Sequence, residues 1–336
     1  MVCVKADAYG HGLIPVARRL VSCGVDYLGV ASIDEGIKIR EAGIKKPVLV
    51  LGLALKKDIS PVFDYGLIPT VCSMELALEL NRRALRSGRK IKVHVKIDTG
   101  MGRIGVLYKD AVPFINKLSG LRFIDIEGVF THFPCADTDR AFTLKQIRLM
   151  KELRLKLERL GLKIPLFHAA NSIGLISYKE SHFDMVRPGL MIYGLYPKKG
   201  LNVKLRPVLS LKTRVVYAKK VPAGYCVSYG RAYRTRKNSL ILTLPIGYGD
   251  GYPRNLSSVG PVLIGGRRFR ISGRVCMDQV MVDAGSFRVK AYEQVALIGS
   301  QGKGSISAEE LAGLCGTIPY EITCGLGSRI PRIYLR

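Results

Sequence analysis

Apolar and polar positions follow one pattern up to about residue 200. Short apolar runs of strand length alternate there with amphipathic stretches of helical length. The predicted strands are Val2–Lys5, Tyr27–Ser32, Pro47–Gly52, Ile68–Ser73, Ile91–Asp98, Ile124–Phe133, Pro165–Asn171 and Asp184–Gly189. The predicted helices include Ile14–Cys23, Asp34–Ala42, Met74–Ser87, Asp110–Leu118 and Thr138–Leu160. Eight strands, each followed by a helix or a short connection, favour an α/β fold of the (β/α)8 barrel type over an open sheet.

After Tyr196–Pro197 the pattern changes to short apolar runs separated by Gly, Pro, Asn and Asp. These runs predict strands at Val208–Val216, Leu240–Pro245, Val262–Ile264, Arg268–Ile271, Gln279–Val282 and Gln294–Ile298. One helix is predicted, Ser307–Cys315, with Ser307 as N-cap and Glu310 as its capping-box partner. We therefore expect an N-terminal barrel over residues 1–204 and a mostly-β domain over residues 205–336.

Composition is that of an ordinary globular protein, with 336 residues of which 48% are hydrophobic. No apolar run has the length of a membrane span, and the N-terminus lacks the pattern of a secretory signal. The eight cysteines lie mostly in apolar segments, without a Cys-x-x-Cys pair or metal-ligand spacing to a histidine. We expect buried free thiols, no metal site, no membrane association and a reducing, cytoplasmic location.

The formal net charge of +27 is the unusual number. Lysines and arginines are spread over the predicted helices instead of forming a tail, and no aromatic-interleaved RNA-binding motif or DNA-reading helix pair is present. We expect a solvated basic surface whose field favours an anionic substrate or cofactor, and no specific nucleic-acid partner.

Polar residues gather where the predicted barrel strands end, which is where barrel enzymes carry their active sites. They are Lys5, Lys96, Arg103, His132, Asn171–Ser172 and Arg187. A lysine in such a cleft is partly desolvated and has cationic neighbours, and both conditions favour its neutral, nucleophilic amine. Schiff-base chemistry with a carbonyl follows naturally, and pyridoxal phosphate is the commonest such partner.

Eight motifs then resemble the alanine racemase family, in family order from residue 2 to residue 332. They are V-K-A-D-A-Y-G-H-G, K-I-D-T-G-M-G-R-I-G, H-A-A-N-S, V-R-P-G, V-S-Y-G, L-P-I-G-Y-G-D-G-Y, G-R-V-C-M-D-Q, and I-P-Y-E-I with R-I-P-R. The resemblance implies a fold-type III pyridoxal phosphate enzyme that acts on L- and D-alanine. It also implies a homodimer with shared active sites, supplying D-alanine for peptidoglycan.

The resemblance implies roles for four catalytic residues. Lys5 resembles the lysine that holds the cofactor and serves as the base on the D-side of Cα, and Tyr229 resembles the opposite-face base from the partner subunit. His132 and Arg187 resemble the network that supports this tyrosine. Arg187 also matches the arginine that faces the cofactor's ring nitrogen, where a permanently charged donor disfavours protonation and weakens the electron sink.

The remaining matched residues divide into four groups. Tyr9, Ser172, Gly189, Leu190 and Tyr320 match the phosphate site, and Arg103 with the Met277 backbone matches the substrate-carboxylate site. Lys96 matches a lysine that is carbamylated in some members and helps to hold the arginine. The substrate entryway, which admits small amino acids, is matched by Asp137, Tyr248, Arg254, Arg274 and Ile318.

Other interpretations stay open beside this one. A broader-specificity amino-acid racemase differs only at the entryway, and an amino-acid decarboxylase on the same architecture places a carboxylate where Arg187 stands. A cofactor carrier with the barrel alone would lack residues 205–336, and a basic nucleic-acid binder is the other non-enzyme class. Family members also carry a strand and a helix before the lysine strand. Because every matched catalytic position is present, we expect activity to be kept and stability to be lower than in a longer form.

Overall fold

The computed structural model describes residues 1–198 and 200–335, which form two compact units. The first unit comprises Met1–Ala8, Gly12–Ile192 and Pro197–Val203. The second comprises Tyr9–His11, Tyr193–Tyr196 and Lys204–Arg336. The short segments Tyr9–His11 and Tyr193–Tyr196 thus belong to the second unit although the residues that flank them belong to the first.

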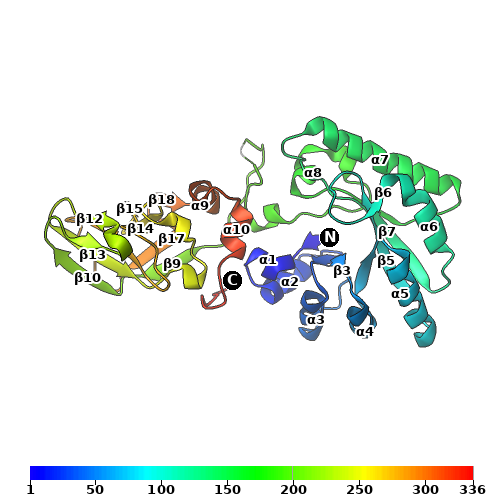
Figure 1. Ribbon diagram of the computed structural model, residues 1–336, viewed down its shortest axis with the longest axis horizontal. Coiled ribbons are helices and arrows are strands. Elements are labelled where there is room, and N and C mark those ends of the chain that lie inside the picture. The colour runs from blue at the N-terminus through cyan, green and yellow to red at the C-terminus, as the bar shows by residue number, and fades with distance from the viewer. Residues whose placement is uncertain (199, 336) are drawn as a thin grey trace. The chain divides into compact units, whose positions relative to one another are not determined.

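The first unit is built on a parallel sheet that follows the chain order. Its strands are β1 (Val2–Cys3), β2 (Leu28–Val30), β3 (Val48–Leu53), β4 (Ile68–Val71), β5 (Ile91–Asp98), β7 (Ile124–Phe130) and β8 (Leu166–His168), and β6 (Val106–Leu107) pairs with β5. The helices are α2 (Leu13–Ser22), α3 (Ile33–Glu41), α4 (Ile59–Asp64), α5 (Met74–Ser87), α6 (Ala111–Ser119) and α7 (Arg140–Arg159). Figure 1 shows these helices ranged outside the strands, as in a barrel.

Local sequence signals explain where these helices begin and end. The Ser73 hydroxyl accepts the Leu76 N–H at 3.3 Å, and Gly88 takes the left-handed conformation that ends α5. The N-cap of α7 is Asp139, whose carboxylate accepts the Phe142 N–H at 2.9 Å. The long helix predicted from Thr138 therefore starts two residues later, behind its cap.

The eighth predicted strand, Asp184–Gly189, is wrong as a regular strand, because these residues form no strand ladder. Pro188 has no N–H to donate, which prevents a complete ladder. Backbone hydrogen bonds nevertheless connect the segment to both neighbours: Asp184 N–H to Phe167 O at 3.0 Å, Arg187 N–H to Ala170 O at 2.8 Å, and Cys3 N–H to Pro188 O at 3.0 Å. The irregular segment therefore joins the end of β8 to β1 and closes the barrel.

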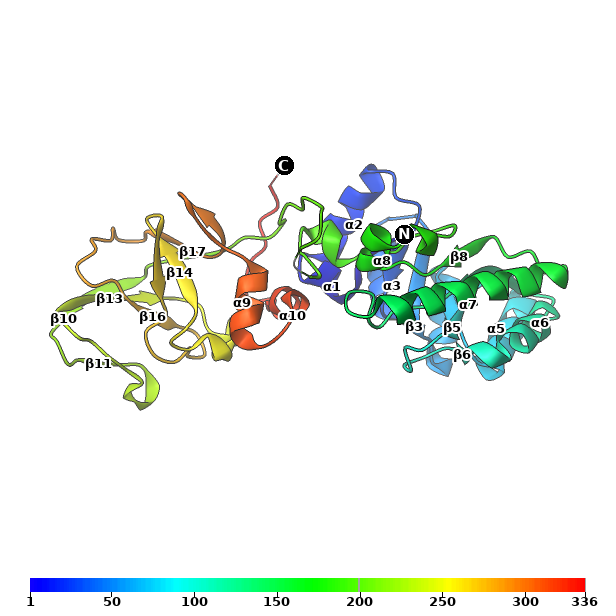
Figure 2. The same cartoon turned by 90° about the horizontal axis from the view of Figure 1, so that it is seen from above.

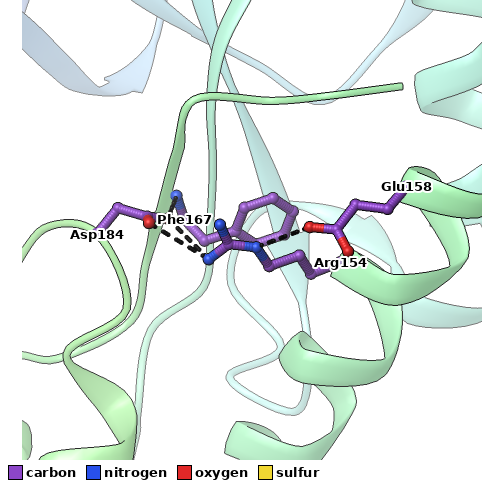
Figure 3. A network of polar contacts seen from close by, with 4 residues as sticks. All are labelled: Arg154, Glu158, Phe167 and Asp184. Atoms are coloured by element: carbon purple, nitrogen blue, oxygen red, sulfur yellow. Dashed lines mark hydrogen bonds and ion pairs between the residues drawn. The ribbon is translucent and has the colours of Figure 1, made fainter. Parts of the chain in front are cut away.

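A side-chain network reinforces this closure (Figure 3). Arg154 of α7 donates to the Asp184 carboxylate at 3.1 Å and to Glu158 at 3.2 Å. The same Asp184 carboxylate accepts the Phe167 N–H at 2.8 Å, and the Arg154 guanidinium lies 5.4 Å from the Phe167 ring centroid. One carboxylate thus ties the closing segment to β8 and to the outer helix.

The second unit consists of antiparallel sheets. Its strands are β9 (Leu211–Arg214), β10 (Tyr217–Val221), β11 (Cys226–Val227), β12 (Tyr233–Arg234), β13 (Ser239–Leu244), β14 (Pro261–Ile264), β15 (Arg267–Arg270), β16 (Val280–Asp283), β17 (Gln294–Gln301) and β18 (Gly304–Ile306). The sheet orders are β10-β13-β16, β11-β12 and β15-β14-β17-β18, with β9 paired to β17. Helices α9 (Ala308–Cys315) and α10 (Pro319–Cys324) lie beside each other in this unit (Figure 2).

The ends of the second unit's helices and the burial of the cysteines differ from the prediction. Ser307 caps α9 by accepting the Glu310 N–H at 3.1 Å, but the Glu310 carboxylate pairs with Arg268 instead of completing a capping box. A second helix, α10, was not predicted, although Pro319 occupies the first-turn position that proline favours. The expectation of buried thiols is confirmed for Cys3 alone, because Cys23 and Cys324 are exposed and the other five cysteines are partly buried.

The remaining helical segments of the described residues are short. They are α1 (Lys5–Tyr9), α8 (Ser172–Ser177), η1 (Lys56–Asp58), η2 (Tyr108–Asp110), η3 (Lys179–Ser181), η4 (Leu190–Tyr193), η5 (Tyr229–Arg231), η6 (Tyr248–Asp250) and η7 (Arg254–Leu256). Among the helices that the structure describes, none combines the length and the apolar character needed to cross a membrane.

Candidate active site

Lys5 opens a left-handed turn directly after β1, so the prediction that it ends a regular strand is wrong. Ala6, Asp7, Ala8 and Tyr9 all have φ between +53° and +55°, a conformation that costs free energy in residues with a Cβ. Backbone N–H groups that donate to carboxylates hold the turn in place. They are Leu13 to Asp7 at 2.7 Å and Ala6 to Glu35 at 2.6 Å.

A cluster of cationic side chains surrounds Lys96 in the first unit. Lys96 is 4% exposed, and burial, reinforced by Arg187, Arg103 and Lys5, lowers its pKa to about 7. The pKa of His132 lies well below its ordinary value, because of burial first and then of the same cations. Lys5, Arg103 and Arg187 therefore lie close enough to Lys96 and His132 to act on both electrostatically.

The loop that carries Arg103 is shaped by Asp98, the last residue of β5. The Asp98 carboxylate accepts the N–H groups of Gly100, Met101 and Gly102 at 2.8, 2.9 and 2.9 Å. These bonds wrap the D-T-G-M-G backbone around one side chain, and Arg103 follows as an exposed residue. The arginine is thus free to meet a ligand while its loop is fixed.

Ser172 sits at the start of α8 and contacts the backbone that follows the barrel-closing segment. Its hydroxyl accepts the Gly189 N–H at 3.1 Å and the Met191 N–H at 3.4 Å, and Leu190 lies between these two residues. Asn171 caps α8 by accepting the Gly174 N–H at 2.9 Å, so these residues begin a helix instead of ending a strand. A hydroxyl, backbone amides and a helix start gather here, which are groups suited to an anion.

Arg187 is buried inside the barrel, and burial lowers its pKa to about 10. Its guanidinium donates to His168 Nδ1 at 2.8 Å, to the Thr131 carbonyl at 2.6 Å and to the Ala169 carbonyl at 3.0 Å. His168 in turn contacts His94 at 2.8 Å. Every one of these acceptors is uncharged, so the guanidinium is oriented without a directly bonded carboxylate.

His168 and His94 were missed as candidate site residues, although the sequence carries a signal for His94. Strand β5 reads I-K-V-H-V-K-I-D, with Lys92, His94 and Lys96 on one face and apolar residues on the other. In a barrel whose helices cover the outside, the polar face must point inward. This alternation predicts a polar barrel interior beside the cationic cluster around Lys96.

Tyr9 and Tyr320 meet in the second unit. Their ring centroids are 5.8 Å apart, and Tyr9 also packs against Tyr193 with centroids at 4.9 Å. The α10 backbone approaches Gly10 so closely that a Cβ at this position would lie 1.9 Å from the Thr323 carbonyl oxygen. Two phenols matched to phosphate binding are therefore packed together by residues far apart in the sequence.

Tyr229, Tyr248, Arg274 and Met277 come together on adjoining loops of the second unit. Ser228 accepts the Arg274 N–H and donates to its carbonyl, both at 2.9 Å, which joins the Tyr229 loop to the Arg274 loop. The Tyr248 N–H donates to the Cys276 carbonyl at 3.0 Å. Tyr229 is 70% exposed and Met277 is 53% exposed, so this cluster presents its side chains outward.

The other residues matched to the entryway lie on separate elements. Arg254 opens η7 and Ile318 is the N-cap of α10, both in the second unit. Asp137 is in the first unit, in the loop before α7, where its carbonyl accepts from Lys198 at 3.1 Å. Its described contact is thus with the loop after the barrel and not with the cationic cluster.

Comparison with known proteins gives matches along nearly the whole chain. Residues 1–197 match the model of the alanine racemase N-terminal domain, and residues 208–334 match that of the C-terminal domain. An alanine racemase of Halothermothrix orenii is 49% identical, over 99% of this chain and 89% of the relative. One from Carboxydothermus hydrogenoformans is 45% identical, over 100% of this chain and 92% of the relative.

Solved structures agree with the sequence matches. An alanine racemase of Clostridium difficile 630 superposes with a TM-score of 0.93 at 39% identity, covering 98% of this chain and 87% of that one. The Bacillus anthracis enzyme with bound L-Ala-P gives 0.93 at 38% identity, covering 100% and 88%. The predicted fold class, a (β/α)8 barrel followed by a mostly-β domain, is confirmed. With its isomerase relatives and both family domains, the chain belongs to the alanine racemase family.

Proposed function

We propose that this chain interconverts L-alanine and D-alanine with pyridoxal phosphate held at Lys5 and with two bases, Lys5 and Tyr229. The observation that carries the proposal is the electrostatic coupling of Lys5, Lys96, Arg103, His132 and Arg187 around one barrel end. A site so rich in cations suits a ligand that bears a phosphate and a substrate that bears a carboxylate.

The donor groups of the chain fit the cofactor. The Lys5 amine would bond to its aldehyde carbon, and the Arg187 guanidinium would face its ring nitrogen. The Ser172 hydroxyl, the Gly189 and Leu190 amides and the Tyr9 and Tyr320 phenols are uncharged donors of the kind that bind a phosphate dianion. When bound, the cofactor withdraws electrons from the amino acid and so stabilises the negative charge left at Cα by proton removal.

Racemisation needs a proton carrier on each face of Cα, and the two bases divide this task. The Lys5 amine takes or returns the proton on the D-side, and Tyr229 of the partner subunit does so on the L-side. A proton removed on one face is replaced by a proton from the base on the other. Each turnover therefore leaves both bases in exchanged protonation states, which solvent or the reverse reaction resets.

The other residues bind and select the substrate in this proposal. Arg103 holds the substrate carboxylate together with the Met277 backbone of the partner subunit, and Lys96, carbamylated, helps to hold Arg103. Tyr248, Arg254, Arg274, Asp137 and Ile318 narrow the entryway to small amino acids. Arg187 stands where a decarboxylase of this architecture carries a carboxylate, which favours racemisation over that alternative.

The proposal extends to assembly and cellular role. A barrel domain over residues 1–204 and a β-rich domain over residues 205–336 would form a homodimer in which the second domain completes the partner's site. The exposure of Tyr229 and Met277 supports this arrangement, because both need a second surface to act. The product, D-alanine, would supply peptidoglycan synthesis in the cytoplasm.

Borohydride reduction followed by peptide mapping tests the central assignment. Reduction fixes the cofactor on the lysine that holds it, so we expect the label on Lys5 in the protein loaded with pyridoxal phosphate. Lys5→Met should lose the label, whereas Lys45→Met, in the loop after α3, should keep it. Label on another lysine of the native chain would refute the assignment.

Subunit mixing tests the shared site. Lys5→Ala and Tyr229→Phe should each be inactive or nearly so, but a heterodimer restores one site in which both residues are native. Random exchange then gives about one quarter of the native number of sites. No recovery after demonstrated exchange would mean that each subunit builds its site alone.

A further inference from the structure

A line of buried polar side chains runs through the barrel interior away from Arg187. Arg187 donates to His168 Nδ1 at 2.8 Å, His168 Nε2 lies 2.8 Å from His94 Nδ1, and His94 Nε2 lies 3.3 Å from Glu127 Oε2. His94 and His168 are both completely buried. A guanidinium and a carboxylate are therefore connected through two imidazoles that have no contact with water.

The chemistry of the groups fixes the direction of every bond in this line. A guanidinium has no acceptor, so His168 Nδ1 must accept and its proton must be on Nε2. His168 Nε2–H then donates to His94 Nδ1, which leaves the proton of His94 on Nε2, directed at Glu127. Burial lowers the pKa of both imidazoles, which keeps each of them neutral with one donor and one acceptor.

Glu127 anchors the far end of the line. Its Oε1 accepts from the Lys92 ammonium at 2.6 Å, and the Tyr27 hydroxyl also hydrogen-bonds to it. Burial alone would raise the pKa of Glu127, but hydrogen bonds from His94, Lys92 and Tyr27 lower it to about 2. The carboxylate is therefore charged around neutral pH, and it can only accept.

The backbone next to His94 is built to admit its ring. A Cβ at Gly128 would lie 2.5 Å from His94 Nδ1 and 2.6 Å from Cε1, so only glycine fits opposite this imidazole. Phe130 stacks on the His168 ring with centroids 4.8 Å apart and planes at 6°. Both rings are thus held in plane, and only their tautomers remain to be set.

We propose that Glu127 is a positioning residue for Arg187, because its carboxylate accepts the His94 Nε2–H at the far end of the line. This bond stabilises the same tautomers of His94 and His168 that the guanidinium requires, and it thereby keeps His168 Nδ1 as an acceptor. With the opposite tautomers, His168 would present an N–H to a group that can only donate, and Arg187 would turn away. The expected effect on catalysis rests on the proposed function. The assignment of the tautomers does not depend on it.

Nitrogen-15 NMR of ring-labelled histidine tests the tautomers in the full chain loaded with pyridoxal phosphate. The chain has five histidines, which single His→Gln variants assign. We expect His94 and His168 to be neutral, each with an acceptor-type Nδ1 and a protonated Nε2. A proton on Nδ1 of either ring, or a doubly protonated ring, in the native protein would overturn the proposal.

Three variants separate the acceptor role of Glu127 from general effects. Glu127→Leu removes the acceptor, so the His94 and His168 signals should shift toward tautomer averages. Glu127→Gln keeps a carbonyl acceptor and should restore the native pattern, and Glu158→Gln on the exposed face of α7 should leave it unchanged. Native signals in Glu127→Leu, or equally shifted signals in Glu127→Gln, would refute the acceptor role.

Kinetics of the same loaded variants test the link to Arg187. Because a misplaced group near the reacting atoms costs up to about 100-fold, Glu127→Leu should lower kcat in both directions by about tenfold or more. The KM for alanine should stay nearly native, and Glu127→Gln should recover most of the rate. A native kcat in Glu127→Leu despite altered tautomers would overturn the positioning role. An inactive native protein would refute the proposed function instead. The NMR result would still decide whether the tautomers are as proposed.

Discussion

The Lys96 ammonium lies over the Phe130 ring, with Nζ 4.4 Å from the ring centroid, and the Arg187 guanidinium lies 5.3 Å from the same centroid. One aromatic ring thus makes cation–π contacts with two buried cations that repel each other. The negative face of the ring offsets part of this repulsion, but the lowered pKa of Lys96 shows that burial and like charge prevail.

The stability of the protein should therefore depend on pH through Lys96. Its pKa is about 7 in the folded chain against an ordinary value of 10.5, so the folded state binds fewer protons than the unfolded state between these values. The free energy of unfolding should rise with pH over this window, by up to about 1.4 kcal/mol per pH unit from this group. Lys96→Met should lack this component in urea titrations at several pH values. An identical pH slope in both proteins would contradict the pKa.

The lowered pKa of Lys96 should also favour carbamylation of its amine. An amine with a pKa of about 7 is largely neutral at pH 8, and the neutral amine adds CO2 to form a carbamate with release of a proton. Carbon-13 bicarbonate should therefore give a carbamate NMR signal at pH 8 that weakens at pH 6 and is missing in Lys96→Met. A signal that persists in Lys96→Met would place the carbamate elsewhere.

Removal of the Tyr229 hydroxyl should separate the two faces of the reaction. Tyr229→Phe should lower racemisation by about 10²- to 10⁴-fold, the usual contribution of a positioned acid or base. Exchange of the D-alanine α-proton with deuterated solvent should continue, because Lys5 serves that face. Tyr217→Phe on the exposed strand β10 is the matched control and should be native. An equal fall of exchange and racemisation would argue against separate bases.

Ser172 should matter to cofactor affinity more than to folding. Its hydroxyl lies among the Gly189 and Met191 amides, so Ser172→Ala removes one donor from the proposed phosphate site. The Kd for pyridoxal phosphate should rise about tenfold, the cost of a hydrogen bond to a charged group. Titration of the cofactor-free protein by absorbance measures this change. Ser177→Ala, at the exposed end of α8, should leave the Kd native. Equal values for the two variants would remove Ser172 from the site.

Asp184 should contribute to stability through barrel closure. Asp184→Ala leaves the Phe167 N–H without its acceptor and leaves the Arg154 guanidinium with Glu158 alone, which should cost about 1–3 kcal/mol in the free energy of unfolding (Figure 3). Glu158→Gln, which changes only the exposed partner of Arg154, should stay within about 0.5 kcal/mol of native. Chemical denaturation compares the two. A loss in Glu158→Gln as large as that in Asp184→Ala would assign the effect to Arg154 alone.

Much of the fold follows from hydrophobic periodicity, because barrel strands and their covering helices have different periods. Helix α5 begins and ends at the predicted residues, since Ser73 and Gly88 are strong local signals. The closing segment Asp184–Gly189 departs from prediction because apolar composition cannot reveal that Pro188 breaks the ladder. The left-handed turn after Lys5 depends on the carboxylates of Asp7 and Glu35, and such side-chain bonds to the backbone do not alter the spacing of apolar residues.

Candidate site residues were found through motifs, whereas the line from Arg187 to Glu127 was not. Glu127 and His94 meet only because β5 and β7 are neighbours, with His94 opposite Gly128 in the register. A sequence read alone gives the spacing within a strand but not the pairing between strands. The inward polar face of β5 could be predicted from the sequence, but the residues that contact it on neighbouring strands could not.

That polar face has a practical consequence for altering the protein. The apolar residues Val93, Val95 and Ile97 of β5 are completely buried on the side toward the helices, while Lys92, His94 and Lys96 occupy the other side. The residues that pack in the hydrophobic layer and the residues of the polar barrel interior therefore lie on opposite faces of the same strand. Substitutions at the inward positions therefore act mainly on the polar network of the barrel interior, and substitutions at the outward positions act mainly on the packing against the helices.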